Sequence, residues 1–483
     1  MTSVDSVTAT KSVKTMPLLT LSAMVVGSMV GAGVFSLPGR FATTTGGLGA
    51  LISWAIAGTG MLMLAFVFQN LALRKPDLDA GVYAYAKAGF GEYLGFFSAF
   101  GYWASACVGN VSYWVLVKST LGQVLPIFGE GNTIWAVLLS TVGIWAFHFM
   151  VLRGVQEAAS INKIVTVAKL VPILVFIVIS LFYFKWDVFT ANFSGGNGYS
   201  ESLFSQISST MTITVFVFLG IEGASVYSRY ARKREDVGRA TVLGFLSVLA
   251  IFASVTMVAY GIMPRADLAG LQQPSMAPAF EASVGTWGAW FISIGVIVSV
   301  MGAYLAWTLM ASEVLFVAAK DRDMPSFLSR VNTENVPLIA LLFTSALVQL
   351  VLLTTLFSDD AFGFTLHLCT ALSLIPYLGA AGYALKLAAT RETYDEDGPG
   401  IRTKELVVAA VATFYTVFLI YAAGLEFLLL SCIIYAPGTI LFALTRREQG
   451  KRLFSAWELL LFIIVAAGAV AGIAGLATGW ITI

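Results

Sequence analysis

Apolar stretches of about 20 residues, separated by short polar segments, recur along the whole chain. A helix of about that length spans the hydrocarbon core of a bilayer. We therefore predict an all-α polytopic membrane protein with about 13 transmembrane helices. Their expected positions are 17–42, 48–73, 91–122, 132–152, 160–184, 204–228, 239–263, 284–318, 337–357, 361–387, 404–423, 425–445 and 457–481.

Glycines interrupt the first and the sixth predicted spans in the middle of their apolar stretches. The first span carries three glycines within residues 27–33, and the sixth carries Gly220 and Gly223 on either side of Glu222. Irregular backbone at membrane depth is tolerated where it lines a cavity or is buried in protein. For either span alone, glycines that only let two helices approach closely are an alternative. Two interrupted spans together favour a transport site.

The spacing of the two interrupted spans predicts a repeat. They are five spans apart, as expected if spans one to five and six to ten are inverted copies of each other. We predict four regions on this basis. They are an N-terminal tail at 1–16, a transport core of ten spans at 17–390, an acidic linker at 391–403, and three accessory spans at 404–483.

Composition narrows the class of protein further. The chain is 58% hydrophobic and 11% charged, whereas soluble domains carry about 25% charged residues. A net charge of +1 gives no field suited to nucleic acid. Cys107, Cys369 and Cys432 form no paired motif, so neither a disulfide framework nor a metal site is predicted. Common hydrolase and nucleotide-binding motifs are missing from the sequence, and we predict neither enzyme activity nor a cofactor.

The basic residues predict the orientation in the membrane. If the N-terminus is cytoplasmic, 23 of the 28 lysines and arginines face the inner side and 3 face the outer side. Inner loops of membrane proteins carry such an excess. An odd number of spans then places the C-terminus outside.

The two breaks predict what the site binds. The N-terminus of a half-helix presents free N–H groups and a partial positive charge, which suit a carboxylate. We therefore expect Gly31, Ala32 and Gly33 to hold a carboxylate. Carbonyl groups at the other break, around Phe218, Leu219 and Ile221, are expected to hold an ammonium group. An α-amino acid carries both groups.

At these motifs the sequence resembles the amino acid–polyamine–organocation transporters, over nearly the whole chain. The matching stretches are 27–38, 75–86, 109–110, 220–225 and 307–325. Within that superfamily it looks most like the basic amino acid antiporters of the arginine–ornithine branch. The resemblance implies a LeuT-like fold in a bacterial cytoplasmic membrane. It also implies exchange of external L-arginine for internal L-ornithine by alternating access.

The resemblance further implies which residues line the substrate site. They lie on spans one, three, six, eight and ten: Ser28, Ala32, Ser105, Ala106, Asn110, Phe216, Trp307, Cys369 and Thr370. Trp307 is expected to stack on the cationic head of the substrate, because an indole face attracts cations. Phe216 is expected to form an aromatic lid. Cys369 stands where the arginine–agmatine exchangers have a serine, which leaves Thr370 or Ser373 to supply a hydroxyl.

Two charged residues inside predicted spans are candidates for gating and coupling, together with Phe216. A buried carboxylate is costly, so Glu222 is expected either to act as counter-charge and gate or to be a polar strut bonded to neighbouring groups. Lys169 is similar to a lysine that replaces a sodium ion in proton-coupled relatives. Its alternative is a lysine whose ammonium reaches the inner surface.

Other functions stay open at this point. A lysine or arginine permease or exchanger, with or without proton coupling, and an amino acid–amine exchanger of the arginine–agmatine type are the nearest rivals. A channel and a non-transporting receptor are the alternatives from other classes. The expected partners are basic amino acids and the lipid bilayer, with a homodimer left open.

Overall fold

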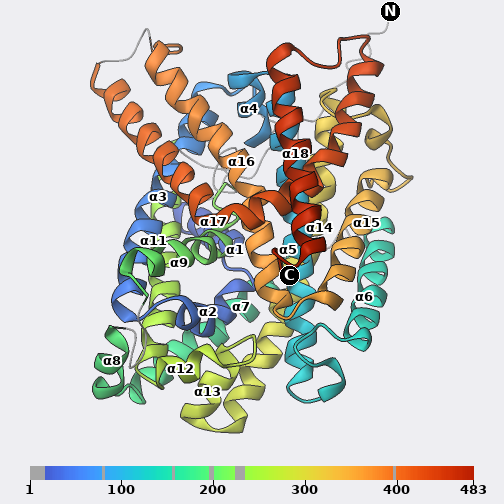
Figure 1. The fold of residues 1–483 in the computed structure, drawn as a ribbon. Helices are drawn as coiled ribbons and strands as arrows, with labels where there is room; N and C mark the ends of the chain where they lie inside the picture. Colours follow the sequence, from blue (N-terminus) through green and yellow to red (C-terminus); the bar gives the residue numbers. More distant parts are fainter. Residues whose placement is uncertain are drawn as a thin grey trace, which may run out of the picture.

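The computed structural model describes residues 17–78, 82–154, 158–194, 201–222, 234–394 and 399–482, and these ranges contain helices and no strand. In chain order the helices are α1 (Leu18–Met29), η1 (Gly33–Ser36), α2 (Leu37–Thr44), α3 (Gly47–Arg74), α4 (Val82–Phe90), α5 (Glu92–Gly122), η2 (Pro126–Phe128), α6 (Ile134–Leu152), α7 (Ala158–Phe182), α8 (Trp186–Phe193), α9 (Leu203–Phe218), α11 (Arg234–Tyr260), α12 (Arg265–Ala269), α13 (Met276–Val284), α14 (Thr286–Lys320), η4 (Ser326–Ser329), α15 (Leu338–Thr354), η5 (Thr355–Phe357), α16 (Ala361–Thr390), α17 (Pro399–Glu448) and α18 (Ala456–Thr478). Figure 1 shows them as one bundle.

The described helices confirm an all-helical, multi-pass membrane protein. Eight of them are long and apolar enough to cross a membrane, or ten if each of two bent helix pairs is one span. The long helix α17 covers the two spans expected at 404–423 and 425–445, and Gly424, between them, has a non-helical φ of 78°. The count of 13 spans and the inverted repeat stay predictions.

The first span is broken where its glycines lie. Helix α1 ends at Met29, and Val30 after it is extended. The chain then turns through η1 into α2, which carries a proline in its first turn, where the missing N–H costs nothing. The two halves are bent by 50° relative to each other.

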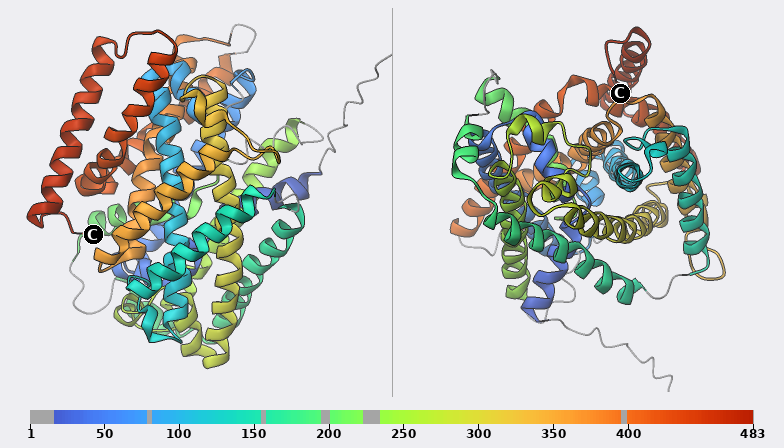
Figure 2. Two further views of the ribbon diagram at one scale, coloured as in Figure 1. Left: turned by 90° about the vertical axis from the view of Figure 1, so that its right-hand side faces the viewer. Right: turned by 90° about the horizontal axis from the view of Figure 1, so that it is seen from below.

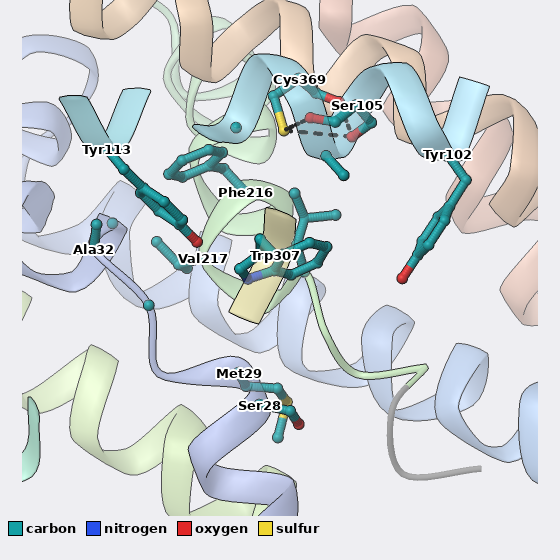
Figure 3. Close-up of a pocket in the computed structure, with 15 residues that line it drawn as sticks. Ser28, Met29, Ala32, Tyr102, Ser105, Tyr113, Phe216, Val217, Trp307 and Cys369 are labelled. Carbon is teal, nitrogen blue, oxygen red and sulfur yellow. Dashed lines mark hydrogen bonds between the residues drawn. The ribbon is translucent and has the colours of Figure 1, made fainter. Parts of the chain in front are cut away.

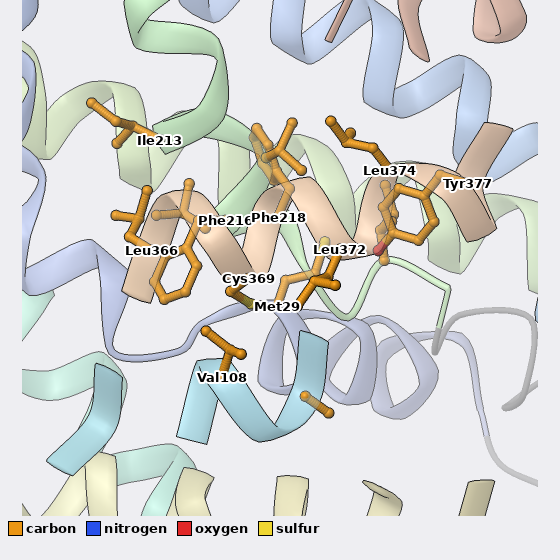
Figure 4. Packing of buried hydrophobic residues seen from close by; sticks show 14 of the residues in the cluster. Met29, Val108, Ile213, Phe216, Phe218, Leu366, Cys369, Leu372, Leu374 and Tyr377 are labelled. Atoms are coloured by element: carbon orange, nitrogen blue, oxygen red, sulfur yellow. The ribbon is translucent and has the colours of Figure 1, made fainter. Parts of the chain in front are cut away.

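Helix α16 lies at the centre of the packing. In the most apolar 18-residue stretch of α16, 72% is buried, against 17% in that of α18. Figure 4 shows side chains of α16, among them Leu372 and Tyr377, between Phe218 of α9 and Val108 of α5. Both views of Figure 2 show the red C-terminal helices at the periphery of the bundle. Most of α18 is therefore exposed in the structure, whereas most of α16 lies in the core.

Short helices close the two ends of the bundle. Helix α4 lies at one end, and α8, α12 and α13 lie at the other (Figure 1); we call these the α4 end and the α13 end. The sequence pattern did not predict these helices, because they are too short to give a membrane-length apolar signal. Asn192 of α8 fixes the α13 end by donating to the carbonyls of Tyr260 at 2.7 Å and Met263 at 2.9 Å.

The linker expected at 391–403 includes the start of a helix among its described residues. Helix α17 already begins at Pro399, inside the 391–403 range. Before it, Glu392 pairs with Lys75 at 2.5 Å. Just inside α17, Glu405 pairs with Arg74 at 2.5 Å. Residues 395–398 of the acidic run lie outside the described residues.

Candidate substrate site

The two predicted breaks meet in space. Gly220, just after the end of α9, has a φ of +102°. A Cβ atom built on Gly220 would lie 2.4 Å from the carbonyl oxygen of Ser28, at the end of α1. Both the positive φ and this close approach require glycine. The sequence therefore folds two helix ends against each other in the interior of the bundle.

A cavity lies beside the junction (Figure 3). Its walls come from the α1–α2 break, α5, α9, α14 and α16. The lining residues are Ser28, Met29, Gly31, Ala32, Gly33, Tyr102, Ser105, Ala106, Gly109, Tyr113, Phe216, Val217, Leu219, Trp307 and Cys369. None of these is an aspartate, glutamate, lysine, arginine or histidine.

The structure brings ten of the predicted site residues together around this cavity. They are Ser28, Gly31, Ala32, Gly33, Ser105, Ala106, Phe216, Leu219, Trp307 and Cys369. Five others do not line it: Asn110, Phe218, Ile221, Glu222 and Thr370. Each of the five is buried beside the cavity wall, so their contacts decide what each can do.

Two of these five use their polar groups to join helices. Asn110 Nδ2 donates to Thr308 Oγ1 at 3.1 Å, which links α5 to α14. Thr370 Oγ1 donates to the carbonyl of Thr212 at 3.1 Å, which links α16 to α9. Ser373, the other hydroxyl expected near Cys369, donates to the carbonyl of Thr370 at 2.7 Å. These hydroxyls are engaged by backbone and do not reach the cavity.

Phe218 and Ile221 are buried at the second break without lining the cavity. The Phe218 ring packs edge-on against Trp54 at 5.9 Å, and the Ile221 side chain is 1% exposed. The Ile221 amide donates to the Phe218 carbonyl at 3.2 Å, which closes a tight turn after α9. Only Leu219 of this segment faces the cavity.

The first break leaves backbone donors free. Among the described residues we find no hydrogen-bond acceptor for the amides of Gly31, Ala32 and Gly33. These amides stand at the start of η1 and α2, where the helix dipole adds partial positive charge. A Cβ on Gly33 would lie 2.7 Å from Val217 Cγ1, so α9 packs directly against the break.

Sequence reasoning missed five lining residues: Met29, Tyr102, Gly109, Tyr113 and Val217. Three of them lie on α5 at helical spacing from Ser105, and residues three and four apart share a helix face. Extending that face in both directions would have identified Tyr102 and Tyr113. Met29 and Val217 carried no polar signal that could have singled them out.

Ser105 and Cys369 bind each other across the cavity wall. Ser105 Oγ donates to the Cys369 carbonyl at 2.8 Å, and Cys369 Sγ donates to the Ser105 carbonyl at 3.2 Å (Figure 3). The Cys369 thiol thus links α16 to α5. Its hydrogen is already used within the protein.

Glu222 is the centre of a hydrogen-bond cluster on the α4 side of the cavity. Tyr102 of α5 donates to Oε1 at 2.6 Å, and Tyr377 of α16 donates to Oε2 at 2.7 Å. The Gly220 amide also donates to Oε2, at 3.2 Å. One carboxylate therefore joins α5, α16 and the second break. Tyr102 also lines the cavity, so it connects this cluster to the site.

Lys169 reaches the first break and not the membrane surface. The residue is 7% exposed, and its Nζ lies 3.5 Å from the carbonyl oxygen of Gly27. Gly27 belongs to the last turn of α1, whose carbonyls carry partial negative charge. The ammonium is thus placed where it can stabilise the end of the first half-helix.

On the α13 side, aromatic rings and an ion pair cover the cavity. Phe216 lines the cavity and meets Phe362 edge-on, with ring centroids 6.1 Å apart. Arg40 of α2 lies 5.1 Å from the Phe362 ring and forms two hydrogen bonds with Asp360, the N-cap of α16. The residues join α2, α9 and α16 over the site.

Comparison with known proteins agrees with this architecture. A family model for amino acid permeases matches residues 17–428, which include both breaks and the whole cavity lining. This chain belongs to the amino acid permease family. The family resemblance inferred from the sequence motifs is confirmed, and this permease is a multi-pass membrane protein.

Relatives of this permease carry several substrate names. It is 50% identical over 470 residues to the arginine/ornithine antiporter of Pseudomonas aeruginosa, with 96% of this chain and 97% of that protein covered. It is 39% identical over 480 residues to the L-lysine transport protein of Corynebacterium glutamicum, with 96% of each covered. It is 35% identical over 482 residues to the arginine/agmatine antiporter of Chlamydia pneumoniae, with 98% and 99% covered.

Proposed function

We propose that this permease is an antiporter that exchanges external L-arginine for internal L-ornithine across a bacterial cytoplasmic membrane, with its N-terminus inside. The observation that carries the proposal is the junction of two broken helices at one cavity, with three free amides on one side. The names of several relatives, among them the arginine/ornithine antiporter at 50% identity, favour this substrate pair.

The junction suits the two charges that every α-amino acid carries. The amides of Gly31, Ala32 and Gly33 would receive the carboxylate. The end of α9, beside Leu219, would offer carbonyl oxygens to the α-ammonium group. Because both partners are backbone groups, this half of the site accepts any α-amino acid and leaves side-chain recognition to the rest of the cavity.

The rest of the cavity suits a cationic side chain held without an acidic partner. Its lining has no carboxylate, so a guanidinium or ammonium group would be stabilised by the Trp307 ring and by dipoles. A cation over an indole is stabilised by roughly 2 kcal/mol or more when desolvated. A carboxylate in the lining would be left unpaired whenever the site is empty. Burying such an isolated charge would cost more free energy than the ring contributes.

Two closures on opposite sides of the cavity would support alternating access. The Phe216, Phe362, Arg40 and Asp360 group covers the α13 side, which we assign to the outside. The Glu222 cluster covers the α4 side, which we assign to the cytoplasm. Opening one while the other stays closed would expose the same site to each side in turn, as in transporters with broken helices.

Transport into proteoliposomes tests the proposal. Radiolabelled arginine should enter vesicles loaded with ornithine or arginine and stay out of empty vesicles. Because arginine and ornithine are both cations at neutral pH, the one-for-one exchange should not respond to a membrane potential. Equal uptake into loaded and empty vesicles would refute exchange.

The outer closure gives a first prediction. Asp360→Asn should keep the cap on α16, because the Gly363 amide bonds Asp360 Oδ1 at 2.9 Å and asparagine caps helices well. It should weaken the pair with Arg40, which is worth about 1 kcal/mol at most when one partner is exposed. We expect apparent affinity for external arginine to rise about two- to fivefold as the outward-open population grows.

Arg40→Gln is the matched variant for that prediction. It removes the same pair from the other side and leaves the Asp360 cap in place, so both variants should shift affinity in the same direction. The measurement is half-saturation of arginine uptake into ornithine-loaded vesicles. Unchanged affinity in both variants would show that the pair does not restrain opening.

Lys169 favours a second candidate, a proton-coupled permease, because its buried ammonium lies at the first break. Under either function we expect uptake to be independent of sodium, with the lysine occupying the place of a cation. Lys169→Met should lower the exchange rate about tenfold, since a hydrogen bond to a charged group contributes about 1.5–3 kcal/mol. Replacing sodium with choline tests the first expectation, and uptake driven by a sodium gradient would contradict it.

A further inference from the structure

A tyrosine hydroxyl opens into the cavity beside the first break. Tyr113 of α5 is 7% exposed and lines the cavity. Figure 3 shows its hydroxyl oxygen pointing into the space near Ala32 and Val217. We find no hydrogen-bond partner for this hydroxyl among the described residues. A buried hydroxyl without a partner is costly, so a ligand atom is the natural partner.

The position of the hydroxyl matches that of the free amides. A Cβ built on Gly31 would lie 3.4 Å from Tyr113 Oη, so the space between them holds about one atom. The amides of Gly31, Ala32 and Gly33 belong to the same stretch of backbone. An oxygen in that space would meet the helix start on one side and the phenol on the other.

The other polar side chains of the cavity are already engaged. Tyr102 donates to a buried carboxylate, and Ser105 and Cys369 donate to each other's backbone carbonyls. Ser28 donates to the Val25 carbonyl at 2.8 Å. That leaves Tyr113 and Trp307 as the lining side chains whose donors have no partner among the described residues. Of these two, Tyr113 is the one that lies against the first break.

We propose that the Tyr113 hydroxyl donates a hydrogen bond to the carboxylate of the transported amino acid and makes the site selective for α-amino acids over their decarboxylated amines. The inference rests on the proposed function, whose carboxylate position it uses. An amine such as agmatine would leave the hydroxyl and the amides unpaired. A site built to bind a polar group rejects an analogue that lacks it far more strongly than one that differs by a methylene.

Tyr113→Phe tests the inference, because it removes the hydroxyl and keeps the ring. In counterflow of labelled arginine, the concentration of arginine needed for half-maximal competition should rise about tenfold, equivalent to about 1.4 kcal/mol. The concentration of agmatine needed should change less than about twofold, because agmatine has no carboxylate to lose its partner. The preference for arginine over agmatine should thus fall about tenfold.

Tyr435→Phe is the matched control. Its hydroxyl is buried and donates to the Leu372 carbonyl at 3.2 Å, outside the cavity lining, so the arginine-to-agmatine ratio should match that of the unmodified protein. Size-exclusion profiles and melting curves check that both variants fold. Equal weakening of arginine and agmatine by Tyr113→Phe would overturn the inference, since the ring position would then only shape the cavity.

The test separates this inference from the proposed function. If the unmodified permease exchanges neither arginine nor ornithine, the proposed substrate pair fails. The same comparison is then made with the α-amino acid that is transported and its own decarboxylated amine. A preserved loss of preference in Tyr113→Phe supports the carboxylate contact even in that case, and an unchanged preference refutes it.

Discussion

Gly220→Ala is expected to lower the exchange rate roughly 100-fold, the loss that misplacing binding groups by about 1 Å causes in enzyme sites. The added Cβ would lie 2.4 Å from the Ser28 carbonyl oxygen. Backbone cannot give way as a flexible side chain can, so the two broken helices must separate. Initial exchange rates in ornithine-loaded vesicles give the measurement.

Gly285→Ala is the control for Gly220→Ala. Gly285, before α14, also has a positive φ of +87°, but a Cβ there meets nothing within 4 Å. It therefore carries the conformational strain without the collision. We expect it to keep most of the exchange activity. If both variants lose activity equally, strain and not the junction of the two breaks explains the result for Gly220.

The core helices and their two breaks could be predicted from the sequence because the apolar runs and the glycines that mark them have strong physical causes. Membrane-length apolar runs leave the backbone few options besides helix, and the described helices follow them closely. Glycines at matching places in spans one and six indicated the breaks. That the two breaks touch, at Gly220 and Ser28, requires three-dimensional packing that no local pattern contains. The short helices at the two ends gave no comparable signal.

Side-chain orientation explains where the site prediction stopped. Cys369 and Thr370 are neighbours on a helix, and successive residues are turned by about 100°, so they do not face the same space. Cys369 lines the cavity, and Thr370 bonds α9 instead. Likewise Gly109 lines the cavity, while Asn110 points to α14. Residue type identified the right turn of each helix, and packing decided the face.

The hydrogen bonds of Glu222 favour one of the two roles that a buried carboxylate could have here. As a counter-charge it would attract the cationic substrate directly. As a strut it would hold the α4 side closed. The carboxylate accepts hydrogen bonds from Tyr102, Tyr377 and the Gly220 amide, and it does not line the cavity. This geometry favours the strut, with Tyr102 as its link to the substrate.

Glu222→Gln is accordingly expected to slow exchange by about 10- to 100-fold while changing arginine affinity less than about threefold. The amide has the size of the carboxylate but loses the charge that strengthens its bonds, each worth about 1.5–3 kcal/mol. The preference for arginine over its uncharged analogue citrulline should stay constant, because the charge acts on two phenols and not on the substrate. Competition in counterflow measures affinity and preference, and initial rates measure turnover.

Combining Tyr377→Phe with Glu222→Gln tests whether the two side chains act together. If Glu222 and Tyr377 act as one closure, the double variant should be no slower than the slower single variant, since groups that share one interaction are not additive. Independent roles would instead multiply the two losses. A citrulline preference that changes tenfold in Glu222→Gln would show that the carboxylate reads substrate charge directly. The closure on the α4 side would then rest on the tyrosines and the helix ends that they join.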